Sequence, residues 1–468
     1  MNTNGLAHVK RRVLSGFVAG SLGPAVSTFI QLVTVPLMLK GWGAALYGEW
    51  LVISAIPTYI ALSDLGFASV AANEMTMQVA ANDRAGAVKT YQSVGVLIAS
   101  LSSLLVLLFS IAAMLLPVRS LLNTPDLHQS ELRMTLMLLA AYAALTLQSG
   151  LVSAGFRCDG HYPFSVSFQN GMRLLESVVS CGLVLSGTRP PIVAVGLLNC
   201  RVLGLLLGNF VLHRWSPWLK LGFSEATSAR IRTLFVPAVS MMAFPLANSI
   251  SFQGTTLLVG HILGPVAVVS FSTLRTFTRF AYQLMESVKN SVWPELSIAF
   301  GQNNLALARS LHRRACQVAL LLSVSTSVLL YVIGPQVYQH WTRNKVPFNA
   351  PVFSLLLGLV VTGTLWNTSS IVAVASNRHK QIAAVYLFAT LVALGVGVAL
   401  TEALGLTGTA LSLFVVDLIM VSFVLRNCLH LVHDSLGAFL SSLFDFSPLV
   451  HLSRSAAFRY GRAETISK

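Results

Sequence analysis

Apolar runs long enough to cross a lipid bilayer recur along almost the whole length of this chain. A helix needs roughly 20 such residues to span the hydrocarbon core, and we count about 12 runs of that kind. The composition agrees, since 54% of the residues are hydrophobic and 10% are charged, against roughly 25% charged in an average soluble domain. The sequence therefore predicts an all-α polytopic membrane protein.

The runs define the expected membrane spans. In the first half they are Val13–Leu39, Leu46–Ala71, Val94–Leu116, Met134–Phe156, Phe164–Ser186 and Pro190–Leu212, and in the second half Thr233–Val259, Ala267–Val292, Val318–Ile333, Pro351–Ala375, Ile382–Thr401 and Leu406–Leu425. An even number of spans places both termini on one side of the membrane. With the termini inside, about 21 lysines and arginines are cytoplasmic and about 6 are outside, and positive charge is retained on the cytoplasmic face. We therefore expect both termini in the cytoplasm.

The formal net charge of +15 would suggest a nucleic-acid partner in a soluble protein. Here most basic residues fall in short loops and tails, where they set topology, so we expect no nucleic-acid partner. The predicted outer loops are too short to hold the acidic catalytic residues of a membrane glycosyltransferase or polymerase, and no Walker sequence is present. The five cysteines show neither a disulfide framework nor a metal spacing. We predict no enzyme activity, no catalytic residues and no metal.

A weak internal repeat relates the two halves of the sequence. The stretch GAALYGEW from Gly43 aligns with GPVAVVSF from Gly264, at an offset of about 221 residues. The same offset pairs Asn82 with Asn303. It predicts two parallel six-helix bundles around a cavity: an N-terminal lobe of residues 1–220 and a C-terminal lobe of residues 221–430. Residues 431–468 form a cytoplasmic tail whose segment LVHDSLGAFLSSLFDF resembles an amphipathic surface helix.

Polar residues share one face of the span that begins at Ala267. Arg275, Arg279, Tyr282, Glu286 and Asn290 follow one another by three or four positions, which places them on the same side of a helix. Arg279 falls near mid-membrane, where an arginine costs about 2.5 to 3.5 kcal/mol on insertion scales. These arginines are therefore expected to face protein or a water-filled cavity.

Three other charges fall close to mid-membrane: Arg173, Arg201 and Asp417. Glu176 follows Arg173 by three positions and can pair with it on the same helix face. Arg201 and Asp417 have no partner on their own helix, so each needs one from elsewhere. A further acid, Asp64, is either a helix-end residue or an ion-coupling group.

The buried segments thus carry more arginines than central acids. Arginine stays charged because its pKa is above about 12, and its guanidinium suits phosphate and carboxylate through paired hydrogen bonds. We predict a positively lined route for an anionic substrate. Its candidate binding residues are Arg275, Arg279, Arg173 and Arg201, and the candidates for proton or sodium coupling are Asp64, Glu286 and Asp417. No other cofactor is expected.

The motifs Tyr47-Gly48-x-Trp50, Asp64-Leu65-Gly66, Gly264-Pro265 and Trp293-Pro294-Glu295 resemble the polysaccharide-transporter, or O-antigen flippase, branch of the MATE-like (MOP) flippase superfamily. The resemblance implies a MATE-like fold of two six-helix lobes in the bacterial inner membrane. It implies alternating access that moves a polyprenyl-diphosphate-linked oligosaccharide to the outer leaflet for surface polysaccharide biosynthesis. Membrane lipids, a polysaccharide polymerase and glycosyltransferases are the partners it suggests. Many relatives have an acidic-basic pair where this chain reads Gly254-Thr255-Thr256, so ion coupling at that position does not carry over.

Two other functions stay open at this point. A multidrug or cation antiporter of the same superfamily would exchange organic cations for protons or sodium, although the arginine excess argues against an acidic drug cavity. A non-transporting scaffold would hold glycan-assembly enzymes through its basic inner loops and tail.

Overall fold

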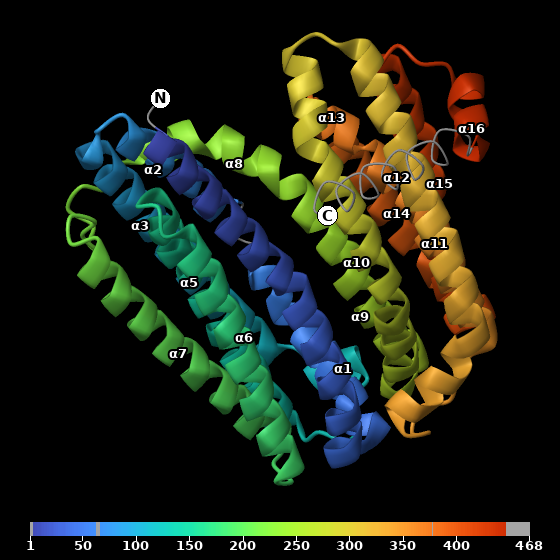
Figure 1. The fold of residues 1–468 in the computed structure, drawn as a ribbon. Coiled ribbons are helices and arrows are strands. Elements are labelled where there is room, and N and C mark those ends of the chain that lie inside the picture. The colour runs from blue at the N-terminus through green and yellow to red at the C-terminus, as the bar shows by residue number, and fades with distance from the viewer. Residues whose placement is uncertain (1–2, 62–65, 377, 446–468) are drawn as a thin grey trace, which may run out of the picture. The chain divides into compact units, whose positions relative to one another are not determined.

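The computed structural model describes residues 3–61, 66–376 and 378–445, and every regular element in that part of the chain is a helix (Figure 1). The first half contains α1 (Thr3–Ala61), α2 (Phe67–Ala80), α3 (Arg84–Leu115), α4 (Val118–Leu122), α5 (Gln129–Cys158), α6 (Tyr162–Leu185) and α7 (Pro190–Trp215). The second half contains α8 (Ser228–Ser249), the π-helix η1 (Ile250–Gly254), α9 (Thr255–Leu263), α10 (Pro265–Gly301), α11 (Leu305–Thr342), α12 (Ala350–Ser369), α13 (Ile371–Ala375), α14 (Lys380–Leu404), α15 (Leu406–Leu431) and α16 (Leu436–Phe444).

The predicted spans correspond to these helices, with one clear correction. The span expected over Leu46–Ala71 is not continuous, because Gly66 lies in a turn before α2 begins at Phe67. Gly66 precedes α2 with a left-handed backbone, φ 77°, a conformation that glycine adopts at little cost. Apolarity alone could not predict this break. The span predicted over Thr233–Val259 contains the π-helical turn η1.

Eight helical segments of the described chain are long and apolar enough to cross a membrane by length and composition. The span predicted over Thr233–Val259 is not among them, and neither are α6 and α10, which were also expected to span. Of these, α6 and α10 hold candidate site residues. Both carry the charged residues that the sequence singled out, such as Glu176 on α6 and Arg275 on α10. The charged residues that were chosen as candidate site residues therefore also lower the mean hydropathy of α6 and α10.

The backbone repeats the internal similarity seen in the sequence. Gly43 (φ 74°, ψ −176°) interrupts α1, and Gly264 (φ 84°, ψ 174°) takes the same conformation before α10. Asn82 and Asn303 are both left-handed, with φ 62° and φ 53°. The residue after each of these asparagines caps the following helix through a side-chain oxygen: Asp83 caps α3 and Asn304 caps α11. Two segments of unlike sequence thus make the same helix boundaries.

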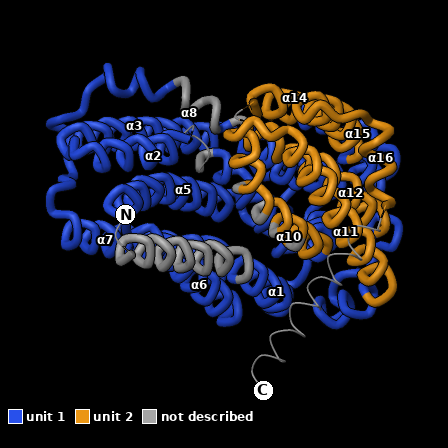
Figure 2. The backbone as a smooth tube through the Cα atoms, turned by 45° about the horizontal axis from the view of Figure 1, so that its top comes forward, with its two compact units in different colours: residues 1–277, 334–353, 390–413 blue, residues 278–333, 354–389, 414–468 orange. Residues whose placement is uncertain are grey.

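The chain forms two compact units, coloured separately in Figure 2. Unit 1 comprises Met1–Phe277, Gly334–Phe353 and Thr390–Leu413, and unit 2 comprises Thr278–Ile333, Ser354–Ala389 and Phe414–Lys468. Several long helices of the second half contribute residues to both units. The division into six-helix lobes at residue 220 remains a prediction.

Unit 1 is organised around α5, which packs against α2, α3 and α7, while α1 packs along α6 (Figure 1). Its core includes Phe67, Tyr91 and Phe156, all almost fully buried. In unit 2, the short α16 packs Phe439 and Leu443 against the rest of the unit beside Leu429, while Leu436, Leu440 and Phe444 are exposed. The amphipathic helix predicted in the tail is therefore present, and part of its apolar side contacts protein.

Candidate functional site

Arg275 lies buried on α10 in unit 1, and two hydroxyls, a carbonyl and an aromatic ring are among its contacts. Its Nη1 donates to the Thr255 hydroxyl at 3.0 Å, and its Nη2 donates to the Phe252 carbonyl at 2.9 Å and to the Thr256 hydroxyl at 3.4 Å. The guanidinium carbon also lies 3.8 Å from the centre of the Phe252 ring, a cation–π contact. Thr255 and Thr256, two of the three residues of the segment Gly254-Thr255-Thr256, thus bind an arginine.

The π-helical turn η1 explains why these groups converge. It lies between α8 and α9, and the Phe252 carbonyl within it accepts hydrogen bonds from the Thr255 and Thr256 hydroxyls as well as from Arg275. A π-turn alters the regular hydrogen-bond ladder of a helix and often marks a functional position. The hydroxyls and the carbonyl orient the Arg275 guanidinium without changing its charge.

The remainder of the predicted polar face of α10 belongs to unit 2. Arg279 is exposed, whereas the hydroxyl of Tyr282 donates to the Leu359 carbonyl at 2.8 Å. Glu286 accepts a hydrogen bond from the Asn367 amide at 2.9 Å and lies 3.4 Å from the ammonium of Lys289. Lys289 was not identified from the sequence, although its spacing from Glu286 is typical of a helical ion pair. The side chain of Asn290 lies outside the described residues.

Asp417 is buried on α15 within unit 2. One carboxylate oxygen accepts the indole N–H of Trp366 at 2.8 Å, and the other accepts the hydroxyl of Thr362. Gly363 lies beside both Asp417 and the Tyr282 hydroxyl, and a side chain there would meet them. The partners that the sequence required for Asp417 are thus neutral donors on α12.

Arg201 and Glu176 form a buried ion pair between α7 and α6. Their closest nitrogen and oxygen atoms are 2.6 Å apart, and Tyr142 on α5 hydrogen-bonds to both. The Arg201 guanidinium also stacks on the Tyr142 ring at 5.0 Å. The predicted pair between Arg173 and Glu176 is therefore wrong. Arg173 is exposed. The buried carboxylate of Glu176 instead pairs with the guanidinium of Arg201 on the neighbouring helix α7.

Of the remaining candidates, Asp64 lies outside the described residues. An acid that sequence reasoning missed is Glu49 on α1, which is fully buried and accepts the backbone N–H of Asp126 at 2.6 Å. Glu49 stands alone in the apolar stretch GAALYGEW, and an isolated glutamate in such a run is the signal that could have identified it. Within the described ranges, no cluster of three His, Cys, Asp or Glu side chains could hold a metal ion.

The groups that contact the two arginines Arg201 and Arg275 differ in kind. Arg201 pairs with a carboxylate in direct contact, and the contacts described for Arg275 include hydroxyls, a carbonyl and a ring. Because a guanidinium stays ionised, Arg275 keeps a permanent positive charge in the interior of unit 1. Arg279, one turn further along α10, presents another at the surface of unit 2.

No family model matches the chain, and no curated protein matches its sequence. Solved structures do match its fold. The structure of a multidrug resistance MATE family transporter of the MOP superfamily, in an inward-facing conformation, has a TM-score of 0.69 at 13% identity and covers 87% of this chain and 96% of its own. The lipid II flippase MurJ, in an inward closed conformation, has a TM-score of 0.68 at 15% identity, with 95% and 99% covered.

An outward-facing MATE transporter is also similar, with a TM-score of 0.60, 15% identity and coverage of 91% of this chain and 97% of its own. These likenesses, together with the eight apolar helical segments, show a multi-pass membrane protein with a MATE-like fold. The predicted fold class is confirmed. At such low identity a shared fold does not identify the substrate.

Proposed function

We propose that this protein is a flippase that moves a polyprenyl-diphosphate-linked oligosaccharide across the bacterial inner membrane by alternating access. The substrate would serve surface polysaccharide biosynthesis, and both termini would lie in the cytoplasm. The fold supports a transporter of either lipid-linked or small cationic substrates, because it resembles both a lipid II flippase and multidrug transporters. The charges of the chain support the lipid-linked substrate.

The observation that carries the proposal is the exposed side chain of Arg279 on α10. A charged group that faces lipid in the bilayer is costly, so intramembrane charges generally face a water-filled route or protein. A guanidinium can bind a diphosphate through paired, charge-assisted hydrogen bonds. It would repel an organic cation. Arg279 is therefore the first diphosphate contact in our proposal.

Arg275, one helical turn before Arg279 on α10, carries a second positive charge. Its guanidinium stays ionised, and the low dielectric of the interior strengthens attraction to an anion. Arg201 takes a structural role in this proposal, because Glu176 already neutralises it. Arg173 is exposed and remains a candidate for contact with acidic sugars.

Two residue changes test the role of Arg279. In cells that depend on this protein, Arg279→Ala is expected to abolish display of surface polysaccharide, and Arg279→Lys to restore part of it by keeping the charge without the planar fork. Arg426→Ala removes an exposed arginine from α15 in the same unit and is expected to have no effect. Membrane abundance of each variant is measured in parallel. Normal display by an abundant Arg279→Ala variant would remove Arg279 from the mechanism.

A cation antiporter is the alternative that the multidrug transporter structures favour. Buried Asp417 would be its acidic group. Drug accumulation and lipid-linked sugar are measured together in cells that lack the protein. Retained drug with intact polysaccharide would favour the antiporter, whereas accumulation of lipid-linked oligosaccharide on the inner leaflet would favour the flippase. A scaffold would flip no labelled lipid-linked sugar in reconstituted vesicles.

A further inference from the structure

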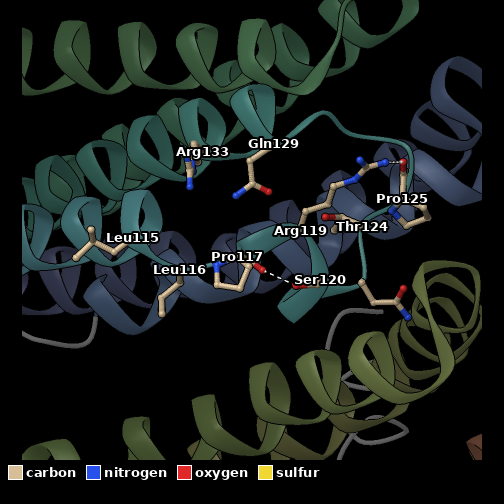
Figure 3. A pocket seen from close by; sticks show the side chains of 10 residues that line it. Leu115, Leu116, Pro117, Arg119, Ser120, Thr124, Pro125, Gln129 and Arg133 are labelled. Carbon is tan, nitrogen blue, oxygen red and sulfur yellow. Dashed lines mark hydrogen bonds between the residues drawn. The ribbon is translucent and has the colours of Figure 1, made fainter.

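A basic pocket lies in unit 1 where the chain passes from α3 to α5 through the short α4 (Figure 3). Its volume is about 620 Å³, and its described lining includes Arg119, Arg133, Asn123, Thr124, Gln129 and Leu115. Carboxylates are not among those described lining residues. The topology predicted from the sequence places this end of α3 on the outer side of the membrane. The pocket therefore combines positive charge with a position at the lipid headgroups.

Backbone carbonyls hold both arginines in place. Arg119 Nη2 donates to the Pro125 carbonyl at 2.7 Å, which Figure 3 draws as a dashed line. Arg133 donates from Nε to the Ala113 carbonyl at 3.0 Å and from Nη2 to the Met114 carbonyl at 2.6 Å. A guanidinium has more N–H donors than these bonds use. Each arginine is thus positioned, and each keeps donors for an anion.

The acids near this loop are already engaged. Glu49 accepts the Asp126 backbone N–H, and Glu131 pairs with Arg189 at 2.6 Å. Glu49 also attracts Arg119 electrostatically, which helps to hold the loop. Neither glutamate, nor Asp126, is among the described residues that line the pocket. The positive charge of the lining itself is not cancelled by a contacting carboxylate.

Thr124 is the independent sign of a missing polar partner. Its side chain lines the pocket and is 1% exposed, and its hydroxyl makes no hydrogen bond with the described residues. A buried hydroxyl without a partner is destabilising, and such groups in native proteins call for a bound polar atom. An oxygen of a phosphate ligand is an acceptor of the required kind.

An exposed apolar stripe on α3 leads to the pocket. Leu104, Leu108, Ile111 and Leu115 lie on one helix face, with 51%, 53%, 44% and 79% of their surface exposed. Leu115 also lines the pocket. A ligand that follows both surfaces must have an anionic head and a long apolar chain.

We propose that this pocket binds the phosphate headgroup of an anionic membrane lipid in the outer leaflet, with an acyl chain along the α3 stripe. Arg119 and Arg133 contact the phosphate, and Thr124 and Gln129 supply neutral hydrogen bonds. The site does not depend on the proposed substrate, because it needs only the folded protein and a lipid. Its assignment to the outer leaflet rests on the proposed topology with both termini in the cytoplasm. Binding here would anchor the loop that connects α3 to α5.

The test uses the purified full-length protein in nanodiscs of phosphatidylcholine with a defined share of phosphatidylglycerol. Bound lipid is counted by native mass spectrometry for the wild type, Arg119→Gln, Arg133→Gln and the double variant. Each arginine lost is expected to weaken phosphatidylglycerol binding about fivefold. Arg343→Gln is the matched control: it removes an exposed arginine in the loop after α11, expected on the same membrane face, and should leave binding unchanged.

Further variants separate the lipid site from a fold defect or a free-phosphate site. Arg133→Gln loses the hydrogen bonds to the α3 carbonyls and could be destabilised for that reason alone. Arg133→Lys serves as a second variant, because it keeps the positive charge and should retain most of the phosphatidylglycerol binding. Leu108→Ser and Leu115→Ser should weaken phosphatidylglycerol binding without changing that of glycerol phosphate. Unchanged lipid selectivity in a folded double variant would overturn the proposal. Binding of glycerol phosphate as tightly as of phosphatidylglycerol would overturn the assignment to a lipid.

Discussion

Glu176 on α6 and Arg201 on α7 lie 2.6 Å apart and share the hydroxyl of Tyr142, so a cation that looked available to a substrate is already paired. The pair joins two helices that are connected by the loop after Leu185. Because the two residues lie on different helices, no spacing within one helix predicts their contact. Among the arginines predicted to bind substrate, Arg201 therefore stabilises unit 1, and the others remain candidates for binding a ligand. The effect of the Glu176–Arg201 pair on stability can be measured.

Removal of either partner of this pair should be more damaging than removal of both. Arg201→Met leaves the Glu176 carboxylate buried and unpaired, and the loss of one partner of a buried ion pair typically costs about 3 to 5 kcal/mol. Adding Glu176→Gln removes the uncompensated charge and should restore part of the thermal stability. The measurement is the melting temperature of detergent-purified protein. Equal melting temperatures for the single and double variants would contradict this reading.

Gly48 should tolerate no side chain. A Cβ atom at Gly48 on α1 would overlap the backbone carbonyl of Pro265, which begins α10. Two of the four motifs that carry the family resemblance therefore pack directly on each other. Gly48→Ala is expected to destabilise the protein by about 1 to 3 kcal/mol through overpacking. Gly171→Ala on α6 is the control. A Cβ there meets nothing within 4 Å, and alanine should stabilise that helix by up to about 1 kcal/mol.

Asp417 should matter for coupling more than for folding. Asp417→Asn keeps the size of the side chain, and its amide can still accept from Trp366 and meet Thr362, so membrane abundance should stay near normal. If Asp417 is the ion-coupling group, flipping of labelled lipid-linked sugar in vesicles should lose its response to a proton or sodium gradient. Thr362→Val keeps the carboxylate and should keep the response. Wild-type gradient dependence in Asp417→Asn would exclude Asp417 from coupling.

The contact that holds the C-terminal helix α16 should weaken in acid. Asp434, just before α16, accepts from the Arg313 Nε at 2.7 Å. Partial burial raises the pKa of Asp434, but the hydrogen bonds and charge of Arg313 outweigh it, so the pKa is lower than usual. A carboxyl whose pKa is lower in the folded state stabilises the protein above its unfolded pKa of about 3.9 and loses that contribution as pH falls through the folded value.

Asp434→Asn should therefore lower the melting temperature by a constant amount from neutral pH down to about pH 5, and the difference from wild type should shrink below about pH 4. Asp83→Asn is a suitable comparison, because Asp83 is an exposed cap of α3 and its replacement keeps an N-cap residue. A difference that persists unchanged at the lowest pH at which the protein stays folded would show that Asp434 acts through packing alone.

Much of the fold followed from local properties of the sequence. Runs of apolar residues predicted where helices lie, because a helix is the segment that satisfies its own backbone, and the aligned glycines Gly43 and Gly264 proved to have matching backbone angles. The break at Gly66 did not follow, since hydropathy does not report a single left-handed residue. The tail segment was amphipathic, but only the structure shows that Phe439 covers protein.

The sequence alone determined that this chain is an all-α membrane protein, that its halves repeat, and that arginines lie in its apolar segments, because composition and periodicity are properties of the chain itself. Only the tertiary structure decided which charge meets which. Glu176 binds Arg201 and not Arg173, Glu286 lies beside Lys289, and Arg275 is held by Thr255 and Thr256. The physical reason is that electrostatic pairing depends on distances between helices, and helix packing fixes those distances through contacts remote in sequence.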